Sequence, residues 1–204
     1  MIFVLLLACI VGLILYLKKG GISLTGDTDV QVEINEVMTS NKGAVPDETG
    51  AFPDWVEIHN RTDSEIDISG YGLSDDLVSA AKWTFPSGSI IEPDGYLVVF
   101  CSGDVTRGEM HAGFKLSASD EVILSTVSGK VVDSVALTPV SSGSSLGRSA
   151  DDESVWTEMF PSPGYPNTDE GVAAYLAALS ADADESVGVF INEFMPSNAS
   201  TIVG

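Results

Sequence analysis

The sequence of this 204-residue chain predicts an all-β protein, an antiparallel β-sandwich over about residues 31–160. Two observations favour that fold class. Short apolar runs alternate with polar residues at the two-residue period of a half-buried strand, and turns rich in Gly and Pro separate these runs. No part of residues 31–160 keeps the period of an amphipathic helix. Many short strands with frequent turns are typical of sandwiches and barrels.

The first two predicted strands show the alternation most clearly. In residues 32–37, one face is expected to hold Val32, Ile34 and Glu36, and the opposite face Glu33, Asn35 and Val37. In residues 54–60, one face is expected to hold Val56 and Ile58, and the opposite face Trp55, Glu57 and His59. Successive side chains of a strand point to opposite faces, so the apolar sets predict which face is buried.

The later strands complete the predicted core. Residues 96–101 are apolar on both faces, as expected of a central strand. Residues 121–127 and 130–137 flank Ser128-Gly129, and a short Gly-containing link between alternating runs predicts a hairpin. We expect these residues in the core: Val32, Ile34, Val56, Ile58, Leu97, Val99, Ile123 and Val135. Three large aromatic side chains are expected to dominate it: Trp55, Trp83 and Phe85.

A short helix is predicted after the proline-rich residues 161–166. Asn167 or Thr168 can cap its N-terminus, and acidic residues follow in the first turn, where the helix dipole favours them. The helix is expected to carry one apolar stripe, made of Val172, Tyr175, Leu176 and Leu179. Residues 169–188 are therefore assigned to this helix and to an acidic linker.

The chain repeats its first strand near its end. Residues 34–41 and 191–198 are identical at six of eight positions. Their separation is too long for a solenoid, whose units run about 20–50 residues, and it matches a whole domain. We therefore expect residues 189–204 to be the first strand of a second module, and the protein to continue beyond them.

The N-terminus predicts a membrane segment. Residues 2–17 form an unbroken apolar run, closed by Lys18-Lys19. We assign residues 1–19 to an uncleaved transmembrane anchor or signal-like segment and residues 20–30 to a linker. The residues before Cys9 resemble a lipoprotein acylation box, but the apolar run continues past the cysteine, where a lipoprotein would turn polar. Lys18-Lys19 alone would keep the following chain in the cytoplasm. The domain is acidic, free of disulfides and rich in Ser, Thr and Gly, and this composition resembles that of an exported domain, so we favour an extracytoplasmic location for residues 20–204.

The charge distribution restricts the partners. The formal net charge is −21; Lys18 and Lys19 are two of only nine basic residues, and all 30 acidic residues follow them. Such a chain repels phosphate, so nucleic acid and anionic lipid are not expected as partners. Cations, basic proteins or neutral glycans fit this charge better, and strong acidity also serves solubility.

Several local patterns resemble functional sites but lack part of what the chemistry requires. Residues 143–147 match the G-x-S-x-G pattern of hydrolases, yet both histidines, His59 and His111, precede it. Neither histidine has a second Cys or His at ligand spacing, so no zinc site is predicted. Cys101 is expected to be a small buried residue and cannot pair with Cys9 in the apolar N-terminal segment.

Acidic clusters and glycosylation patterns are equally weak signals. Residues 182–193 follow a calcium-loop template except for Val187, which stands where the loop needs Gly. Acidic pairs at Asp75-Asp76 and at residues 151–153 are expected to be solvated turn residues. The sequons at Asn60 and Asn198 have meaning only in a secretory host.

Seven short motifs in one order resemble the lamin tail domain of secreted and surface proteins of bacteria. They are residues 34–38, 54–60, 68–76, 82–86, 114–117, 145–148 and 161–164. The resemblance covers about residues 31–168 and implies an immunoglobulin-like β-sandwich with no established catalytic residues. Similar proteins often carry tandem copies, sometimes ahead of a spore-coat CotH-like kinase domain.

We therefore expect a non-enzymatic, membrane-anchored, extracytoplasmic interaction or spacer module that binds a protein or glycan at the cell surface. The alternative is an accessory region of a larger surface or spore-coat enzyme, with a CotH-like kinase domain beyond residue 204. No catalytic, cofactor-binding or metal-binding residues are predicted, and residues 28–168 are expected to fold without metal. Loops 39–53 and 102–113 are where we expect a ligand, because binding residues concentrate on loops.

Overall fold

The computed structural model describes residues 32–182. The chain divides into two units, Met1–Val30 and Gln31–Gly204, and the described residues belong to the second. No helix within residues 32–182 is long and apolar enough to cross a membrane. The predicted anchor at 1–19, the linker at 20–30 and the repeated strand at 189–204 lie outside the described residues.

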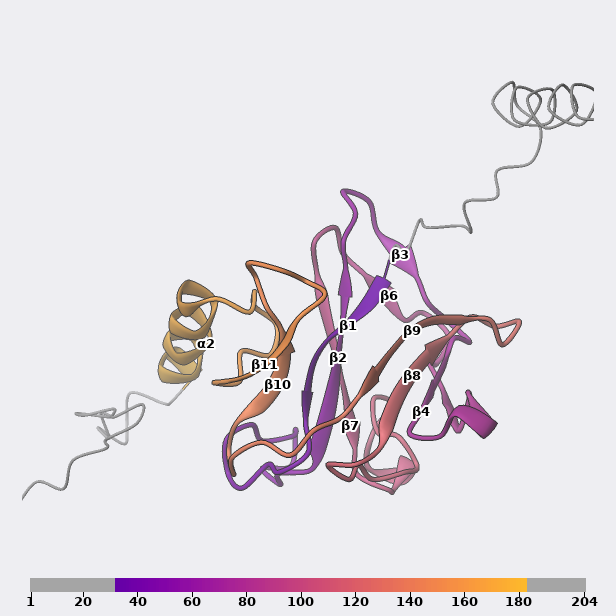
Figure 1. Cartoon of the computed structure of the whole chain (residues 1–204), viewed down its shortest axis with the longest axis horizontal. Coiled ribbons are helices and arrows are strands. Elements are labelled where there is room, and N and C mark those ends of the chain that lie inside the picture. Colours follow the sequence, from indigo (N-terminus) through magenta and orange to yellow (C-terminus); the bar gives the residue numbers. More distant parts are fainter. Residues whose placement is uncertain (1–31, 183–204) are drawn as a thin grey trace, which may run out of the picture. The chain divides into compact units, whose positions relative to one another are not determined.

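Two antiparallel sheets form the domain (Figure 1). The five-stranded sheet has the order β11-β10-β1-β2-β7, with β1 at Val32–Met38, β2 at Asp54–Asn60, β7 at Tyr96–Cys101, β10 at Ser145–Arg148 and β11 at Trp156–Met159. The four-stranded sheet has the order β5-β4-β8-β9, with β4 at Gly72–Ser74, β5 at Trp83–Thr84, β8 at Glu121–Ser125 and β9 at Val131–Ala136. The short strands β3 (Ile66–Asp67) and β6 (Ile90–Ile91) pair separately. The predicted all-β class is confirmed.

Three helices complete the described chain. Two are single 3-10 turns, at Leu77–Ser79 and Val105–Arg107, and the third is α2 at Asp169–Asp182. Thr168 caps α2, because its Oγ1 accepts a hydrogen bond from the Gly171 amide at 3.0 Å. The predicted hairpin is present as β8–β9, but its strands are shorter than expected and residues 126–130 form the turn.

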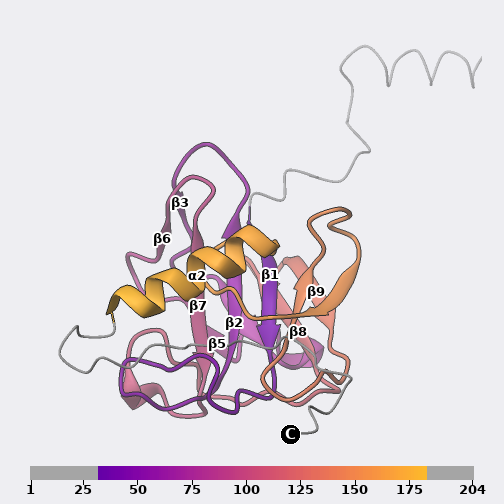
Figure 2. The same ribbon diagram turned by 90° about the vertical axis from the view of Figure 1, so that its left-hand side faces the viewer.

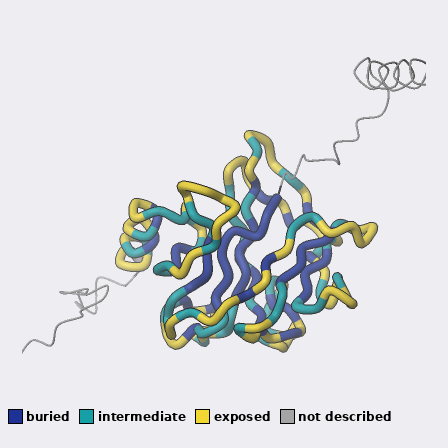
Figure 3. Tube along the Cα trace, in the orientation of Figure 1, coloured by how far each residue is buried: buried dark blue, intermediate teal, exposed yellow. Residues whose placement is uncertain are grey.

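The main core lies between the two sheets, where buried strands run through the middle of the domain (Figure 3). Six of the expected core residues belong to it: Val32, Ile34, Val56, Ile58, Val99 and Val135. Leu97 packs against it half-buried, and Ile123 is buried outside it while its neighbours Val122 and Leu124 point inward. The free thiol of Cys101 is buried there too, and burial raises its pKa.

The predicted faces of β1 are wrong beyond Ile34. Ile34 pairs with Ile58 and Glu36 with Glu57, so Asn35 is an extra residue that forms a β-bulge. A bulge shifts the alternation by one residue. Val37 therefore joins Ile34 in the core, and Glu36 lies on the outer face of the five-stranded sheet instead of the core face.

The outer face of this sheet is covered by residues 161–168 and α2, which crosses it in Figure 2. A second apolar cluster lies there: Met38, Val45, Trp55 and Tyr175. Trp55 thus belongs to this cluster and not to the main core, whereas Phe85 is in the main core and Trp83 packs against it. The apolar stripe predicted for α2 is only partly buried, since Tyr175 is covered and Leu179 is 40% exposed.

Glu36 and Glu57 are both fully buried beneath this cover and lie opposite each other in the β1–β2 pair. Glu36 accepts hydrogen bonds from the amide and hydroxyl of Ser162 and from the Ser145 hydroxyl. Glu57 accepts from the Asn35 side chain at 2.8 Å and from the Gly164 amide at 2.5 Å. Among the described residues, no Lys or Arg pairs with either carboxylate. The two carboxylates therefore fasten the covering segment to the sheet.

Burial raises the pKa of Glu36 to about 7. Burial and, after it, the neighbouring charge of Glu36 raise the pKa of Glu57 to about 8. Two unpaired negative charges on directly opposite residues are unfavourable in a low-dielectric interior, so the folded domain binds protons here more tightly than the unfolded chain. This stabilising contribution is complete below about pH 4.5 and is lost as the pH rises through 7 to 8.

The first prediction follows from this titration. Between pH 5 and pH 8.5, the free energy of unfolding should fall by an amount on the order of 3 kcal/mol that depends on the Glu36–Glu57 pair. Urea unfolding at both pH values measures it. Glu57→Gln should reduce the fall, while Glu65→Gln, at an exposed position, should leave it unchanged. An equal pH dependence in the wild type and Glu57→Gln would contradict the assignment.

The second prediction concerns the docking of α2. Tyr175→Ala should lower the free energy of unfolding by about 3 kcal/mol, because it removes a buried aromatic ring. Tyr175→Phe should stay within about 1 kcal/mol of the wild type, since the hydroxyl has no hydrogen-bond partner among the described residues. Leu179→Ala, at an exposed position of the same helix, is the control for helix propensity. A Tyr175→Ala variant as stable as Leu179→Ala would show that α2 does not stabilise the sheet.

Candidate functional site

The loops that follow β1 and β7 meet at one end of the domain. The strands alternate in direction, so the end of β1, the start of β2 and the end of β7 lie at the same end of the five-stranded sheet. Loops 39–53 and 102–113 therefore lie side by side, at the lower end in Figures 1 and 2. Arg107 joins them through an ion pair with Asp47 and a 3.0 Å hydrogen bond to Thr49. The two loops chosen from the sequence are thus one surface.

Side chains inside loop 39–53 hold its backbone in place. The Asn41 amide group donates to the carbonyl oxygens of Val45 at 2.6 Å and Pro53 at 2.8 Å. One oxygen of Asp47 accepts from the Thr49 amide at 2.9 Å and the Ala51 amide at 3.0 Å. Burial acts to raise the pKa of Asp47, but these hydrogen bonds and the charge of Arg107 together hold it below its usual value. The loop is therefore ordered before any partner binds.

A hollow of about 400 Å³ opens between the loops. It is lined by Thr39, Ser40, Asn41, Lys42, Ala51, Phe52, Pro53, Asp54, Cys101, Ser102, Arg107 and Lys115. Three of these residues are cationic and one, Asp54, is acidic. Burial raises the pKa of Asp54, although Lys42 and Lys115 act in the opposite direction. Neither lysine forms an ion pair with a described residue, so their charges face the hollow and the solvent.

His111 lies beside this hollow on a segment that extends the sheet. The Phe100 amide donates to the Met110 carbonyl, and the Ala112 amide donates to the Phe100 carbonyl, both at 2.8 Å. This parallel pairing places His111 next to the edge strand β7, where its ring stacks on Phe100 with centroids 5.3 Å apart. His111 is only 1% exposed. Its position is therefore set by backbone pairing and by stacking.

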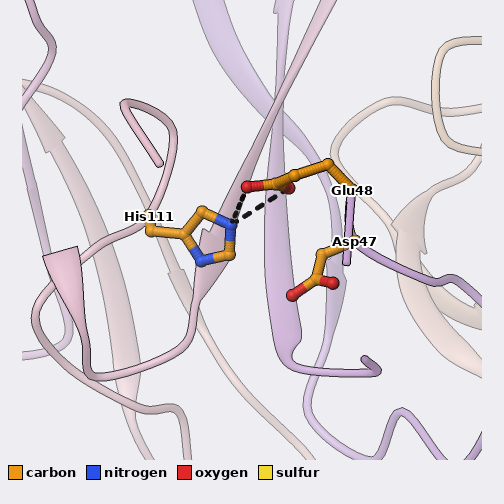
Figure 4. A group of neighbouring side chains, drawn as sticks. All are labelled: Asp47, Glu48 and His111. Atoms are coloured by element: carbon orange, nitrogen blue, oxygen red, sulfur yellow. Dashed lines mark hydrogen bonds and ion pairs between the residues drawn. The ribbon is translucent and has the colours of Figure 1, made fainter. Parts of the chain in front are cut away.

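Both ring nitrogens of His111 have polar neighbours. Nδ1 lies 3.0 Å from the Ser102 hydroxyl, and Nε2 lies 2.9 Å and 3.2 Å from the two carboxylate oxygens of Glu48 (Figure 4). Asp47 lies beside them, and ligand atoms of Asp47, Glu48 and His111 are within 4.8 Å of one another. A His and two carboxylates from two loops are thus grouped at this end of the domain.

The G-x-S-x-G pattern is structural in the folded domain. Ser145 is fully buried on β10, and its hydroxyl donates to Glu36. His59 lies elsewhere, stacked on Tyr96 with its Nε2 3.0 Å from Asp94. His111 is committed to Glu48 and Ser102. Since neither histidine contacts Ser145, these residues form no nucleophile–base pair.

The acidic clusters singled out by the sequence form ion pairs and hydrogen bonds with neighbouring residues. Asp75 and Asp76 lie 2.7 Å and 3.8 Å from the Lys82 ammonium group. Asp152 accepts from the Ser154 amide at 3.0 Å, and Glu153 pairs with Arg61. Of the calcium-loop template, only Asp182 falls within the described residues, as the last residue of α2.

The Asn60 sequon is inaccessible in the folded domain. Asn60 is fully buried, and its amide nitrogen donates to the carbonyl oxygens of Ser64, Ile91 and Glu92 at 2.8–3.0 Å. A glycan on this nitrogen would break these bonds. Asn60 therefore ties β2 to the chain after β6, and the Asn198 sequon lies outside the described residues.

The sequence did not single out Asp47, Glu48, Glu57 or Arg107 as functional residues. Glu48 and His111 are 63 positions apart, and no local spacing connects them. Glu36 and Glu57 each read as an ordinary strand residue until the bulge and the covering segment are known. Only the abundance of polar residues in loops 39–53 and 102–113 was a usable signal.

A model of the lamin tail domain family matches residues 26–139. The match covers more than half of the chain, which therefore belongs to this family. Lamin tail domains are immunoglobulin-like interaction modules and are not typically enzymes, which agrees with the antiparallel sheets seen here. A search of curated proteins found no match. Loops 39–53 and 102–113 both lie inside the matched range. Strands β10 and β11 and residues 161–168, which cover Glu36 and Glu57, lie beyond it.

Proposed function

We propose that this protein is a membrane-anchored, extracytoplasmic interaction and spacer module whose binding surface is the end formed by loops 39–53 and 102–113. Family membership supports the interaction role. The apolar run at residues 2–17 supports the anchor, because a lysine pair closes it and a polar linker follows. The acidic, Ser-, Thr- and Gly-rich composition of the rest supports an extracytoplasmic location.

The observation that carries the binding site is the gathering of cations at the hollow. Outside residues 1–19 the chain has only seven Lys and Arg residues, and Lys42, Arg107 and Lys115 all line this hollow. Elsewhere, Arg61, Lys82 and Arg148 are in ion pairs with acidic side chains. Arg107 is paired with Asp47, but Lys42 and Lys115 form no ion pair with a described residue, so a negatively charged partner group would meet these two lysines.

The shape and order of the hollow favour a small group. Loop 39–53 is held by its own hydrogen bonds, so binding costs little conformational entropy in this loop. Phe52, which is 43% exposed, adds an apolar contact. The strongly acidic remainder of the domain repels long polyanions. These features favour a single carboxylate group, such as an acidic side chain of a protein or a uronic acid of a glycan.

The third prediction tests this surface. Lys42→Glu/Lys115→Glu should weaken binding of a carboxylate probe at least tenfold, because attraction becomes repulsion. The full chain in detergent would be titrated with an oligosaccharide that carries one galacturonic acid unit and with a peptide that contains one Glu, and the two arms separate a glycan from a protein source. Chemical shifts in loops 39–53 and 102–113 would report binding.

Lys130→Glu, in the β8–β9 turn, is a control for charge reversal away from the hollow and should bind like the wild type. A neutral glucose oligomer should produce no shifts. Equal binding by the wild type and the double variant, or the absence of shifts with both carboxylate probes, would contradict the proposed surface.

The fourth prediction concerns location. The chain should fractionate with membranes, and deletion of residues 1–19 should move it to the soluble fraction, because that deletion removes the apolar run. Protease added to intact cells should then remove the domain from the full chain. A membrane-bound but protease-resistant domain would place it on the cytoplasmic side, as Lys18-Lys19 alone would favour.

A further inference from the structure

The hydrogen bonds around His111 show which tautomer would leave a ring nitrogen free for a metal ion. The Ser102 hydroxyl donates to the Asp104 carbonyl oxygen at 3.1 Å. A hydroxyl has one proton, so toward His111 this oxygen can only accept. Nδ1 of His111, 3.0 Å away, donates to this oxygen in the tautomer that carries its hydrogen on Nδ1. In the neutral ring, the Nε2 nitrogen then has a free lone pair.

That lone pair faces an acceptor. Nε2 lies 2.9 Å and 3.2 Å from the two oxygens of Glu48, and an ionised carboxylate has no proton to donate. In this tautomer, the Nε2 lone pair and the Glu48 carboxylate can bind one metal ion together. In the other tautomer, Nε2 donates a hydrogen bond directly to Glu48.

The surroundings are those of a metal ligand set. The Asp47 carboxylate is a third group within 4.8 Å of the other ligand atoms, so modest side-chain movement brings all three to one ion (Figure 4). Ser102 can accept a hydrogen bond from Nδ1 of His111, and Arg107 with Thr49 orients Asp47. Such outer hydrogen bonds accompany most metal-binding histidines and carboxylates. The Glu48 side chain is 52% exposed, which leaves the site open to water.

Gly108 provides the space for this arrangement. A Cβ atom at this position would lie 2.6 Å from a Glu48 carboxylate oxygen and 3.1 Å from Cδ2 of His111. Any side chain would displace the Glu48 carboxylate from the ring. The backbone of Gly108 is extended, a conformation that any residue can adopt. Glycine is therefore favoured here because the side chains of Glu48 and His111 lie so close.

We propose that Asp47, Glu48 and His111 bind a divalent transition-metal ion, with Zn²⁺ as the best fit. One imidazole nitrogen and two carboxylates suit zinc, with water completing the tetrahedron, whereas Ca²⁺ and Mg²⁺ prefer oxygen ligands alone. The ion would tie loop 39–53 to loop 102–113. This proposal does not rest on the carboxylate-bearing partner proposed above, although Arg107 borders both sites.

The test uses the full chain without a polyhistidine tag, stripped with EDTA and titrated with zinc chloride or calcium chloride in detergent. Isothermal titration calorimetry should show one zinc ion per chain and much weaker calcium binding. Excess zinc should raise the melting temperature by about 5 °C, because a ligand that binds only the folded state stabilises it.

Glu48→Gln should weaken zinc binding at least tenfold, and its exposed position lets the variant fold. His111→Gln should do the same, while His59→Gln, at the other histidine, should bind zinc like the wild type. Absence of stoichiometric zinc binding, or equal affinity in the wild type and Glu48→Gln, would overturn the proposal and leave a proton between His111 and Glu48.

Discussion

The structure depends on the opposition of two buried carboxylates, Glu36 and Glu57, with no described cation beside them. Their oxygens need donors, and Asn35 together with Ser145, Ser162 and Gly164 supplies them. These hydrogen bonds hold residues 161–168 against the outer face of the five-stranded sheet. It thereby places Thr168 to cap α2 and Tyr175 to cover Trp55. One electrostatic requirement thus links the first strands to the last helix.

The few basic residues are distributed in a second, related pattern. Arg148 on β10 pairs with Asp133 on β9 of the other sheet and donates to the carbonyl of Ile34 on β1. Its guanidinium also lies 4.8 Å from the Trp156 ring centroid. Arg107 joins the two ligand-site loops. In a domain with so many acidic residues, each cation can hold two chain segments together. Lys42 and Lys115 differ from these arginines because neither lysine forms an ion pair with a described residue. This difference is why the proposed function depends on them.

The two proposals for the loop end are electrostatically compatible. Arg107 lines the hollow and also contacts Asp47 of the proposed metal site, so an ion bound there would add positive charge close to the hollow. Such charge strengthens attraction for a carboxylate group without any change in fold. The sandwich supplies a rigid edge, and the loops that follow β1 and β7 supply the chemistry, as is usual for binding modules built on β scaffolds.

The sequence by itself determined the all-β class, the inward faces of β2, the buried Cys101 and a capped helix start at Asn167 or Thr168. Each depends on a local rule, such as the two-residue period of a strand or the hydrogen bond of a capping hydroxyl. The bulge at Asn35, the place of Trp55 under α2 and the pairing of Glu48 with His111 were decided only by the tertiary structure. They depend on residues 22 to 132 positions apart, whose approach is set by sheet register and loop packing and leaves no local pattern.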